Sequence, residues 1–239
     1  MSRGKQLVKD KSIVVPGEVV AEGKDFILGP GVRREGNQIV ASRVGLIHFE
    51  GKLIKLIALS GRYIPRRDDV IIGRIKEILI NGWLVDTESA YPAMLNVRDA
   101  VTEYVAKGSD LTRFFDFNDY IVCKIINVTP QMLVDVTTKG PGLKKLIGGR
   151  IIKVNPNKVP RIIGKKGSML NMIKQATGCN IIVGQNGVIW IKSTDPKMEL
   201  IAVNTIKTIE EESHVPGLTE KIHAYLEKET GKKIELQKE

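Results

Sequence analysis

Two glycines with two lysines between them, Gly164-Lys165-Lys166-Gly167, mark the segment best suited to binding an anion. A glycine carries no side chain, so the backbone there can come close to a sugar-phosphate chain. The residues that follow, Ser168–Thr177, have the apolar spacing of a helix. Because the start of a helix presents unpaired N–H groups and a positive dipole end, it attracts phosphate. The pattern therefore predicts a loop that contacts phosphate groups.

The charge around this loop has a single sign. The chain has a formal net charge of +10, and residues 140–194 contain 10 Lys and Arg but no Asp or Glu. A merely solvated surface usually mixes both signs, so this stretch favours a nucleic acid as partner. Besides the two loop lysines, we expect contacts to the nucleic-acid backbone from Arg150, Lys153, Lys158 and Arg161.

Nothing in the sequence predicts a catalytic site. The three histidines, His48, His214 and His223, lack the spacing of metal ligands, and neither a P-loop nor a nucleophile elbow is present. Acidic runs such as Asp68-Asp69 are typical of solvated surfaces. We therefore expect a non-catalytic protein without a metal ion or cofactor.

The two cysteines and the hydropathy bear on the cellular compartment. Cys123 and Cys179 lie in separate apolar segments and form no paired motif, which predicts buried free thiols. No apolar run approaches the roughly 18 residues of a membrane-spanning helix, and the first residues lead into no apolar signal segment. The expectation is a soluble cytoplasmic protein.

Turn residues and charge divide the chain into three regions. Residues 1–66 carry 12 basic and 6 acidic residues. Residues 67–139 carry 8 basic and 11 acidic residues, and residues 140–239 carry 17 basic and 10 acidic residues. The first region has short β-branched runs between Gly and Pro turns, so we expect an all-β unit with its clearest strands at 38–47 and 52–59.

The second region predicts a small barrel. Five short strands are expected at 69–79, 82–87, 90–97, 120–128 and 132–137, with the longest loop at 99–116. This number and spacing suit a closed barrel of the OB type. Gly140-Pro141-Gly142 is expected to end the unit.

The third region predicts a β-α-α-β-β-α order. It comprises a strand at 151–154, helices at Val159–Ile163 and Ser168–Thr177, a hairpin of Asn180–Val183 with Val188–Lys192, and a helix from Pro196 to about residue 213. A further helix is expected at 219–230. Asp195 is the expected N-cap of the long helix, and Leu170, Ile173 and Trp190 are expected in the core.

The glycine loop and this order of elements resemble the KH domain over about 60 residues. In that family a Gly-x-x-Gly loop clamps about four nucleotides of single-stranded RNA or DNA. The resemblance implies that Gly164, Lys165, Lys166 and Gly167 form the clamp.

The middle region resembles the S1 domain, an RNA-binding barrel of the OB type, in its strand spacing and in the runs Gly82–Asp86 and 93–97. That family often stacks bases on two aromatic residues and a histidine, whereas the matching positions here hold Asn81, Leu84 and Asn96. We therefore expect a few local RNA contacts instead of an aromatic platform, made by Lys76, Arg98, Lys107, Arg113 and Lys124. Trp83 and Tyr91 stay as candidates for stacking.

A β-rich region, an S1 domain and a single KH domain, in this order, resemble the archaeal exosome's RNA-binding cap subunit of the S1/KH type over nearly the whole chain. The resemblance implies three copies docked through the N-terminal unit on a ring of RNase PH-like nuclease subunits. It further implies capture of single-stranded, A-rich 3′ ends of RNA for 3′-to-5′ degradation by the ring.

Two alternatives remain open. A free-standing S1/KH regulator of translation or transcription would use the same loops without a ring, although transcription factors with this order usually carry two KH units. Polynucleotide phosphorylase has its KH domain before its S1 domain, which is the reverse of the order here. A scaffold whose basic face binds acidic proteins would show no salt-dependent affinity for RNA.

Overall fold

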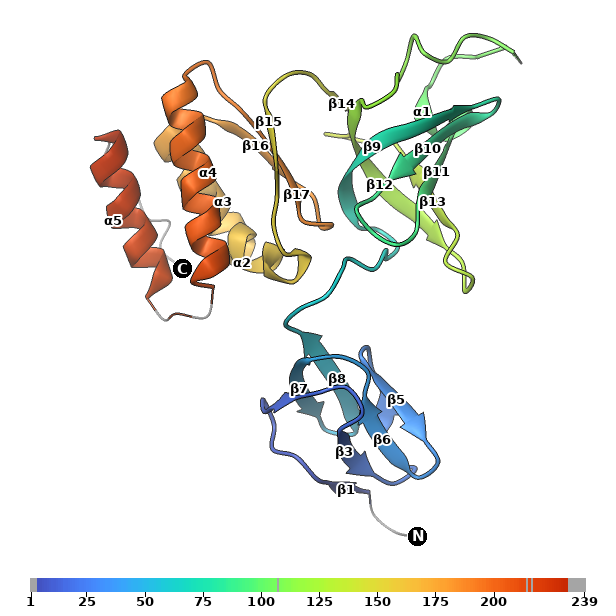
Figure 1. The fold of residues 1–239 in the computed structure, drawn as a ribbon, viewed down its shortest axis with the longest axis vertical. Helices are drawn as coiled ribbons and strands as arrows, with labels where there is room; N and C mark the ends of the chain where they lie inside the picture. Colours follow the sequence, from blue (N-terminus) through green and yellow to red (C-terminus); the bar gives the residue numbers. More distant parts are fainter. Residues whose placement is uncertain (1–3, 107, 214, 216, 232–239) are drawn as a thin grey trace. The chain divides into compact units, whose positions relative to one another are not determined.

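The structure, a computed structural model, describes residues 4–106, 108–213, 215 and 217–231 of the 239-residue chain. These residues form two compact units, of which the first ends at Gly61 and the second begins at Arg62 (Figure 1). The barrel and the helix-containing region share the second unit. The division into three domains stays a prediction.

The N-terminal unit consists of two four-stranded sheets that share one apolar core. One sheet has the order β1 (Lys5–Gln6), β3 (Val19–Glu22), β6 (Gln38–Ala41), β5 (Val32–Glu35). The other has the order β2 (Ile13–Val14), β7 (Gly45–Glu50), β8 (Leu53–Ala58), β4 (Ile27–Leu28). Both sheets supply core residues, such as Val20 and Ile39 from the first and Ile47 and Ile54 from the second. The predicted all-β unit is confirmed.

The single strand expected at 38–47 is wrong, because the chain changes sheets within it. It forms β6 in one sheet and β7 in the other. A Cβ at Gly45 would collide with the side chain of Leu56, so close packing between β7 and β8 requires glycine at this point. Apolar residues stand on both sides of the switch, at 39–41 and 44–47, and only Ser42-Arg43 interrupts them. This interruption is too short to predict a change of sheet.

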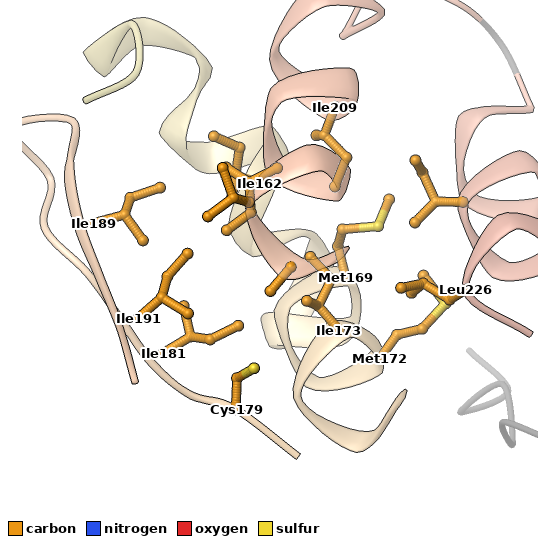
Figure 2. Close-up of a cluster of buried hydrophobic side chains, with 14 of the residues drawn as sticks. Ile162, Met169, Met172, Ile173, Cys179, Ile181, Ile189, Ile191, Ile209 and Leu226 are labelled. Atoms are coloured by element: carbon orange, nitrogen blue, oxygen red, sulfur yellow. The ribbon is translucent and has the colours of Figure 1, made fainter. Parts of the chain in front are cut away.

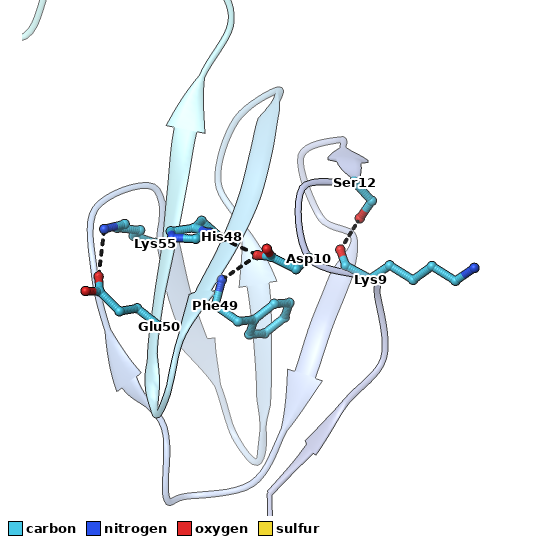
Figure 3. A network of polar contacts seen from close by, with 7 residues as sticks. All are labelled: Lys9, Asp10, Ser12, His48, Phe49, Glu50 and Lys55. Carbon is cyan, nitrogen blue, oxygen red and sulfur yellow. Dashed lines mark hydrogen bonds and ion pairs between the residues drawn. The ribbon is translucent and has the colours of Figure 1, made fainter. Parts of the chain in front are cut away.

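A polar cluster fastens the loop before β2 to strand β7 (Figure 3). Asp10 Oδ1 accepts a hydrogen bond from the Phe49 N–H at 2.9 Å and lies 3.0 Å from His48 Nδ1. The Phe49 N–H, followed by His48, lowers the pKa of Asp10. On the neighbouring strand, Lys55 Nζ pairs with Glu50 at 2.8 Å, which lowers the pKa of Glu50.

Five strands of the second unit close into the predicted OB-type barrel. They are β9 (Val70–Leu79), β10 (Gly82–Asp86), β11 (Ala93–Asn96), β12 (Tyr120–Val128) and β13 (Val134–Thr137), in the order β13-β11-β10-β9-β12. Pairing of β12 with β13 closes the ring. A short helix, α1 (Val97–Ala100), follows β11. The core is centred on Trp83, which is fully buried and donates from Nε1 to the Phe115 carbonyl at 2.9 Å.

The barrel sheet extends beyond the glycines that were expected to end it. Strand β14 (Lys145–Leu146) pairs with the start of β12, where Tyr120 lies opposite Leu146. The chain therefore contributes to the barrel sheet after Gly140-Pro141-Gly142. Two residues are too few to produce a strand pattern in the sequence.

The last region has the predicted β-α-α-β-β-α order with a further helix. A sheet of β15 (Arg150–Lys153), β17 (Val188–Lys192) and β16 (Asn180–Val183) is covered on one face by helices (Figure 1). The helices are α2 (Val159–Ile163), α3 (Ser168–Thr177), α4 (Pro196–Glu211) and α5 (Leu218–Thr230), with 3₁₀ turns η1 (Pro156–Lys158) and η2 (Lys165–Gly167). Asp195 caps α4 by accepting from the Lys197 N–H at 2.8 Å, as predicted.

The helices and the sheet enclose a core of branched and sulfur-containing side chains. Figure 2 shows Ile181, Ile189 and Ile191 of the sheet facing Ile162 and Ile173 of the helices. Ile173 is fully buried, whereas Leu170 is only partly buried and packs at the edge of the cluster. Burial of this apolar surface fixes α2 and α3 on the sheet, and hence the loop that joins them.

The other face of this sheet packs against the barrel. Val188 and Trp190 of β17 form a cluster with Ile72, Val122 and Leu146 of the barrel. Strand β17 is thus covered on both faces, which explains its unbroken apolar run. Trp190 is buried, as expected, but in this junction cluster instead of under the helices, and its Nε1 donates to the Gly148 carbonyl at 2.7 Å.

The turn between β16 and β17 inserts into the junction. Asn186 Nδ2 donates to the carbonyls of Ile72 at 2.8 Å and Thr87 at 3.0 Å, while its Oδ1 accepts from the Ile72 N–H at 3.3 Å. The Gln185 N–H donates to the Val70 carbonyl at 2.9 Å. A buried amide with these partners holds the turn firmly against β9.

Candidate nucleic-acid interface

The Gly164-Lys165-Lys166-Gly167 loop connects α2 to α3 through a tight turn. Gly164, Lys166 and Gly167 have positive φ angles of 77°, 52° and 83°. The Gly164 N–H ends α2 by donating to the Pro160 carbonyl at 2.9 Å. This backbone course leaves the side chains of Lys165 and Lys166 exposed. The loop therefore presents two positive charges from a fixed turn.

The two glycines have different structural roles. A Cβ at Gly164 would lie 2.7 Å from the backbone nitrogen of Met169, so the space beside Gly164 is filled by the protein's own helix α3. A Cβ at Gly167 would have Asn171 Nδ2 as its nearest neighbour, at 3.7 Å. The side of Gly164 where a Cβ would stand is thus closed by α3, whereas the same side of Gly167 is more open. That both glycines let the backbone approach a ligand stays a prediction.

The start of α3 adds a favourable field. Gly167 is the N-cap residue, and among the described residues no side chain makes a capping hydrogen bond there. The Ser168 N–H donates to the Lys165 carbonyl of the η2 turn, so the first N–H group of α3 has a partner. The helix dipole still leaves partial positive charge at this end of α3. Together with the ammonium groups of Lys165 and Lys166, this charge suits a phosphate group.

Lys158, a predicted backbone contact, is engaged within the protein. Its Nζ donates to the Glu210 carbonyl at the end of α4, at 2.7 Å. Glu210 Oε1 in turn accepts from the Asn155 N–H at 2.6 Å. These two bonds fasten the segment before α2 to α4. The structure therefore gives Lys158 a part in holding the base of the loop.

The other predicted contacts near the loop divide between free and paired surfaces. Arg161 on α2 and Arg150 on β15 are exposed. Lys153 forms an ion pair of 2.6 Å with Glu88 of the barrel, and this hydrogen bond raises the pKa of Lys153. Lys153 thus contributes to the junction of barrel and sheet.

The predicted contacts on the barrel do not gather on one element. Lys76 lies on β9 and Arg98 on α1, both exposed. Lys124 on β12 pairs with Asp68 at 2.7 Å and lowers the pKa of Asp68. Arg113 lies in the loop between α1 and β12, over the ring of Phe114. Lys107 lies outside the described residues.

Of the two aromatic residues considered for stacking, one is excluded. Trp83 is fully buried in the barrel core, so its ring faces are inaccessible to a base. Tyr91 is 38% exposed. The positions where S1 domains often stack bases hold Asn81, Leu84 and Asn96, none of which offers an aromatic face.

The described residues offer no group of three or more His, Cys, Asp or Glu side chains placed to bind a metal ion. Both cysteines are buried free thiols, as predicted, and burial raises the pKa of Cys123 to about 12. None of the helices in the described part of the chain combines the length and apolarity needed to cross a membrane.

Comparison with known proteins places the chain in a family. The KH domain family matches residues 149–197, from β15 to the start of α4. Exosome complex component Rrp4 of Thermococcus kodakarensis is 41% identical over 225 residues, which cover 93% of this chain and 87% of that protein. This chain belongs to the Rrp4 family of exosome complex components. The Rrp4 protein of Methanothermus fervidus is also 41% identical, over 92% of this chain and 96% of its own length.

A solved structure supports membership of the Rrp4 family. It is described as an exosome complex RNA-binding protein, is 35% identical and superposes with a TM-score of 0.64. The match covers 71% of this chain and 97% of the other. The resemblance to the S1/KH cap family that the sequence indicated is therefore confirmed.

Sequence reasoning missed three residues of this Rrp4-family chain that shape the interface. Asn186 was taken as part of an ordinary hairpin turn, but its side chain is buried against the barrel. Glu210 was given no role by the sequence, but its Oε1 accepts a hydrogen bond from the Asn155 N–H. Phe114, which supports Arg113, produced no signal either. For Asn186 the sequence signal indicated only the turn, Gly184-Gln185-Asn186-Gly187, and not its contact with the barrel.

Proposed function

We propose that this chain is the non-catalytic cap of an exosome, which binds single-stranded RNA and delivers it to nuclease subunits. Membership of the Rrp4 family and the description of the solved relative support this function. The observation that carries the proposal is the exposed Lys165-Lys166 pair, placed on a tight turn at the start of α3.

In this function the loop binds the RNA backbone. Phosphate groups lie beside Gly167, where a Cβ would meet only Asn171 Nδ2, at 3.7 Å. The exposed Lys166 and Arg161 supply positive charge. Such contacts release counterions and carry no sequence information, which suits a protein that must accept many transcripts. A preference for A-rich 3′ ends would arise from base stacking, because adenine offers a large stacking face.

The N-terminal unit offers an apolar surface for docking. Ile13, Leu46 and Ile57 lie opposite one another on β2, β7 and β8 and form a continuous row on one face of the sheet. Ile13 is 65% exposed and Ile57 is 53% exposed. Exposed apolar rows of this kind mark interaction surfaces. We assign this row to contact with the RNase PH-like ring, with three copies of the chain on each ring.

Purification of the tagged chain from its native cell tests the assembly. We expect ring-forming nuclease subunits to co-purify with the parent chain. The double variant Ile13→Lys with Ile57→Lys should lose them and keep its affinity for RNA, while Leu133→Lys, at an exposed leucine of the barrel, should keep both. Recovery of ribosomal or transcription proteins without nuclease subunits would overturn the cap assignment.

A nuclease assay tests the non-catalytic part of the proposal. The purified chain, incubated with labelled RNA, Mg²⁺ and phosphate, should leave the RNA at full length. Addition of ring subunits should restore shortening from the 3′ end. Shortening by the chain alone, at a rate unchanged by further purification, would show that it has a catalytic site.

A further inference from the structure

The long loop between α1 and β12 packs several apolar side chains against the barrel core and leaves other side chains exposed. Leu111 and Phe115 are buried in the barrel core, and the Phe115 carbonyl accepts the hydrogen bond of Trp83. In contrast, Tyr104 is 91% exposed and Phe117 is 58% exposed. The loop thus combines a rigid attachment with aromatic side chains that the core does not use.

Arg113 lies over the ring of its neighbour Phe114 in this anchored segment. Its guanidinium carbon lies 4.5 Å from the centre of the Phe114 ring. The Phe114 ring meets the indole of Trp83 edge to face, with centroids 6.4 Å apart and an interplanar angle of 89°. Trp83 is fully buried and Arg113 is exposed, so the contacts from Trp83 through Phe114 to Arg113 connect the barrel core to the surface.

A guanidinium fixed in this way suits one particular ligand. Arginine is planar and weakly hydrated, so it stacks on aromatic rings and nucleobases where lysine does not. Single-strand binding proteins combine such stacking surfaces with positive charge. A guanidinium already ordered on Phe114 loses less rotamer entropy when a second ring covers it.

We propose that Arg113, backed by Phe114, is a nucleobase-stacking site of the barrel, which accepts one unpaired base of bound RNA. This inference rests on the proposed function and adds the base-contacting part to it. It also supplies the stacking surface that Asn81, Leu84 and Asn96 cannot provide. The guanidinium replaces the missing aromatic side chain, from a loop and not from the strands.

A pairwise comparison of protein and RNA tests the stacking site. One RNA is an A-oligomer of about 12 nucleotides, a length that spans typical single-strand sites. The other has the same backbone with stable abasic sugars in place of all bases. Arg113→Lys keeps the charge but removes the planar group. Arg67→Lys is the matched control, because Arg67 is an exposed arginine just before β9 with no assigned RNA contact.

We expect Arg113→Lys to weaken binding of the A-oligomer by about 5- to 150-fold, the range of one stacked base, and to leave affinity for the abasic backbone unchanged. The salt dependence should stay as in the parent, because the charge is retained. Arg67→Lys should bind both RNAs as the parent does. Phe114→Leu should reduce affinity for the A-oligomer in the same way, with the fold checked by circular dichroism.

Three results would overturn the stacking site while leaving the proposed function intact. The first is that Arg113→Lys and the parent bind the A-oligomer with equal affinity. The second is that Arg113→Lys loses affinity equally for both RNAs. The third is that Arg113→Lys shows a reduced salt dependence of binding. The last two would make Arg113 a backbone contact. Failure of the parent to bind either RNA would instead remove the proposed function itself.

Discussion

The side-chain amide of Asn186 forms hydrogen bonds with both the N–H and the C=O of Ile72. Strand β10 pairs with β9 only from Arg74 onward, so Ile72 has no strand neighbour on that side. The amide of Asn186 therefore takes the place of a peptide group and completes the barrel sheet from the KH region. This bond pair makes the barrel and the β15-β17-β16 sheet parts of one packed unit.

Asn186→Asp should be strongly destabilising although it changes one atom. The new carboxylate has no donor for the carbonyls of Ile72 and Thr87 and repels both in a buried site. We expect a loss of about 2–4 kcal/mol in the free energy of unfolding, measured by urea denaturation. Gln185→Glu, which adds the same charge one residue away, should cost much less. Equal stability of the two variants would contradict this role of Asn186.

The two glycines of the loop should respond differently to alanine. Gly164→Ala requires a positive φ and also brings Cβ against Met169, so we expect a loss of about 3 kcal/mol. Gly167→Ala meets open space and should cost about 1 kcal/mol for its backbone conformation. Thermal denaturation followed by far-ultraviolet circular dichroism measures both. A larger loss for Gly167→Ala would reverse the assigned roles.

Lys158 and Lys166 should differ in the salt dependence of RNA binding. Lys166→Ala removes a phosphate contact, so the slope of log K against log salt should fall by about 0.7, the value per contact for single strands. Lys158→Met removes the hydrogen bond to Glu210 and should weaken binding without changing that slope. Titrations at several salt concentrations separate the two effects. A slope change for Lys158→Met would show that its ammonium also contacts RNA.

Stability at high pH should depend on Tyr63. Its hydroxyl donates to Asp69 Oδ2 at 2.6 Å, and burial, followed by this bond, raises the pKa of Tyr63. A group with a raised pKa in the folded state stabilises fully below its unfolded pKa of about 10, and this contribution is lost as pH rises above that value. The melting temperature should therefore fall above pH ~10, and Tyr63→Phe should reduce that fall. An unchanged pH profile in Tyr63→Phe would contradict the assignment.

Local patterns in the sequence were sufficient for the elements that carry strong local signals. Asp195-Pro196 predicted the start of α4, and the apolar spacing of Ser168–Thr177 predicted α3. These features depend on caps and on helical periodicity, which involve residues close in the chain. The barrel strands were found for the same reason, with errors of a few residues at their ends.

Contacts between residues far apart in the sequence could not be predicted. Asn186 lies 114 residues from Ile72, and Lys158 lies 52 residues from Glu210. A lysine in a basic stretch has the same signature whether it binds RNA or its own helix. In the same way, the apolar residues of 38–47 did not reveal that the chain leaves one sheet for another.

Binding of a fluorescent A-oligomer by Gly167→Asp, measured by anisotropy at moderate salt, tests the central claim most directly. Gly178→Asp is the matched control, because Gly178 also has a positive φ and open space but ends α3 instead of starting it. A carboxylate at position 167 meets the expected phosphate, so affinity should fall at least tenfold. Gly178→Asp should bind as the parent does, and equal affinity of all three proteins would contradict the loop as the RNA-binding site.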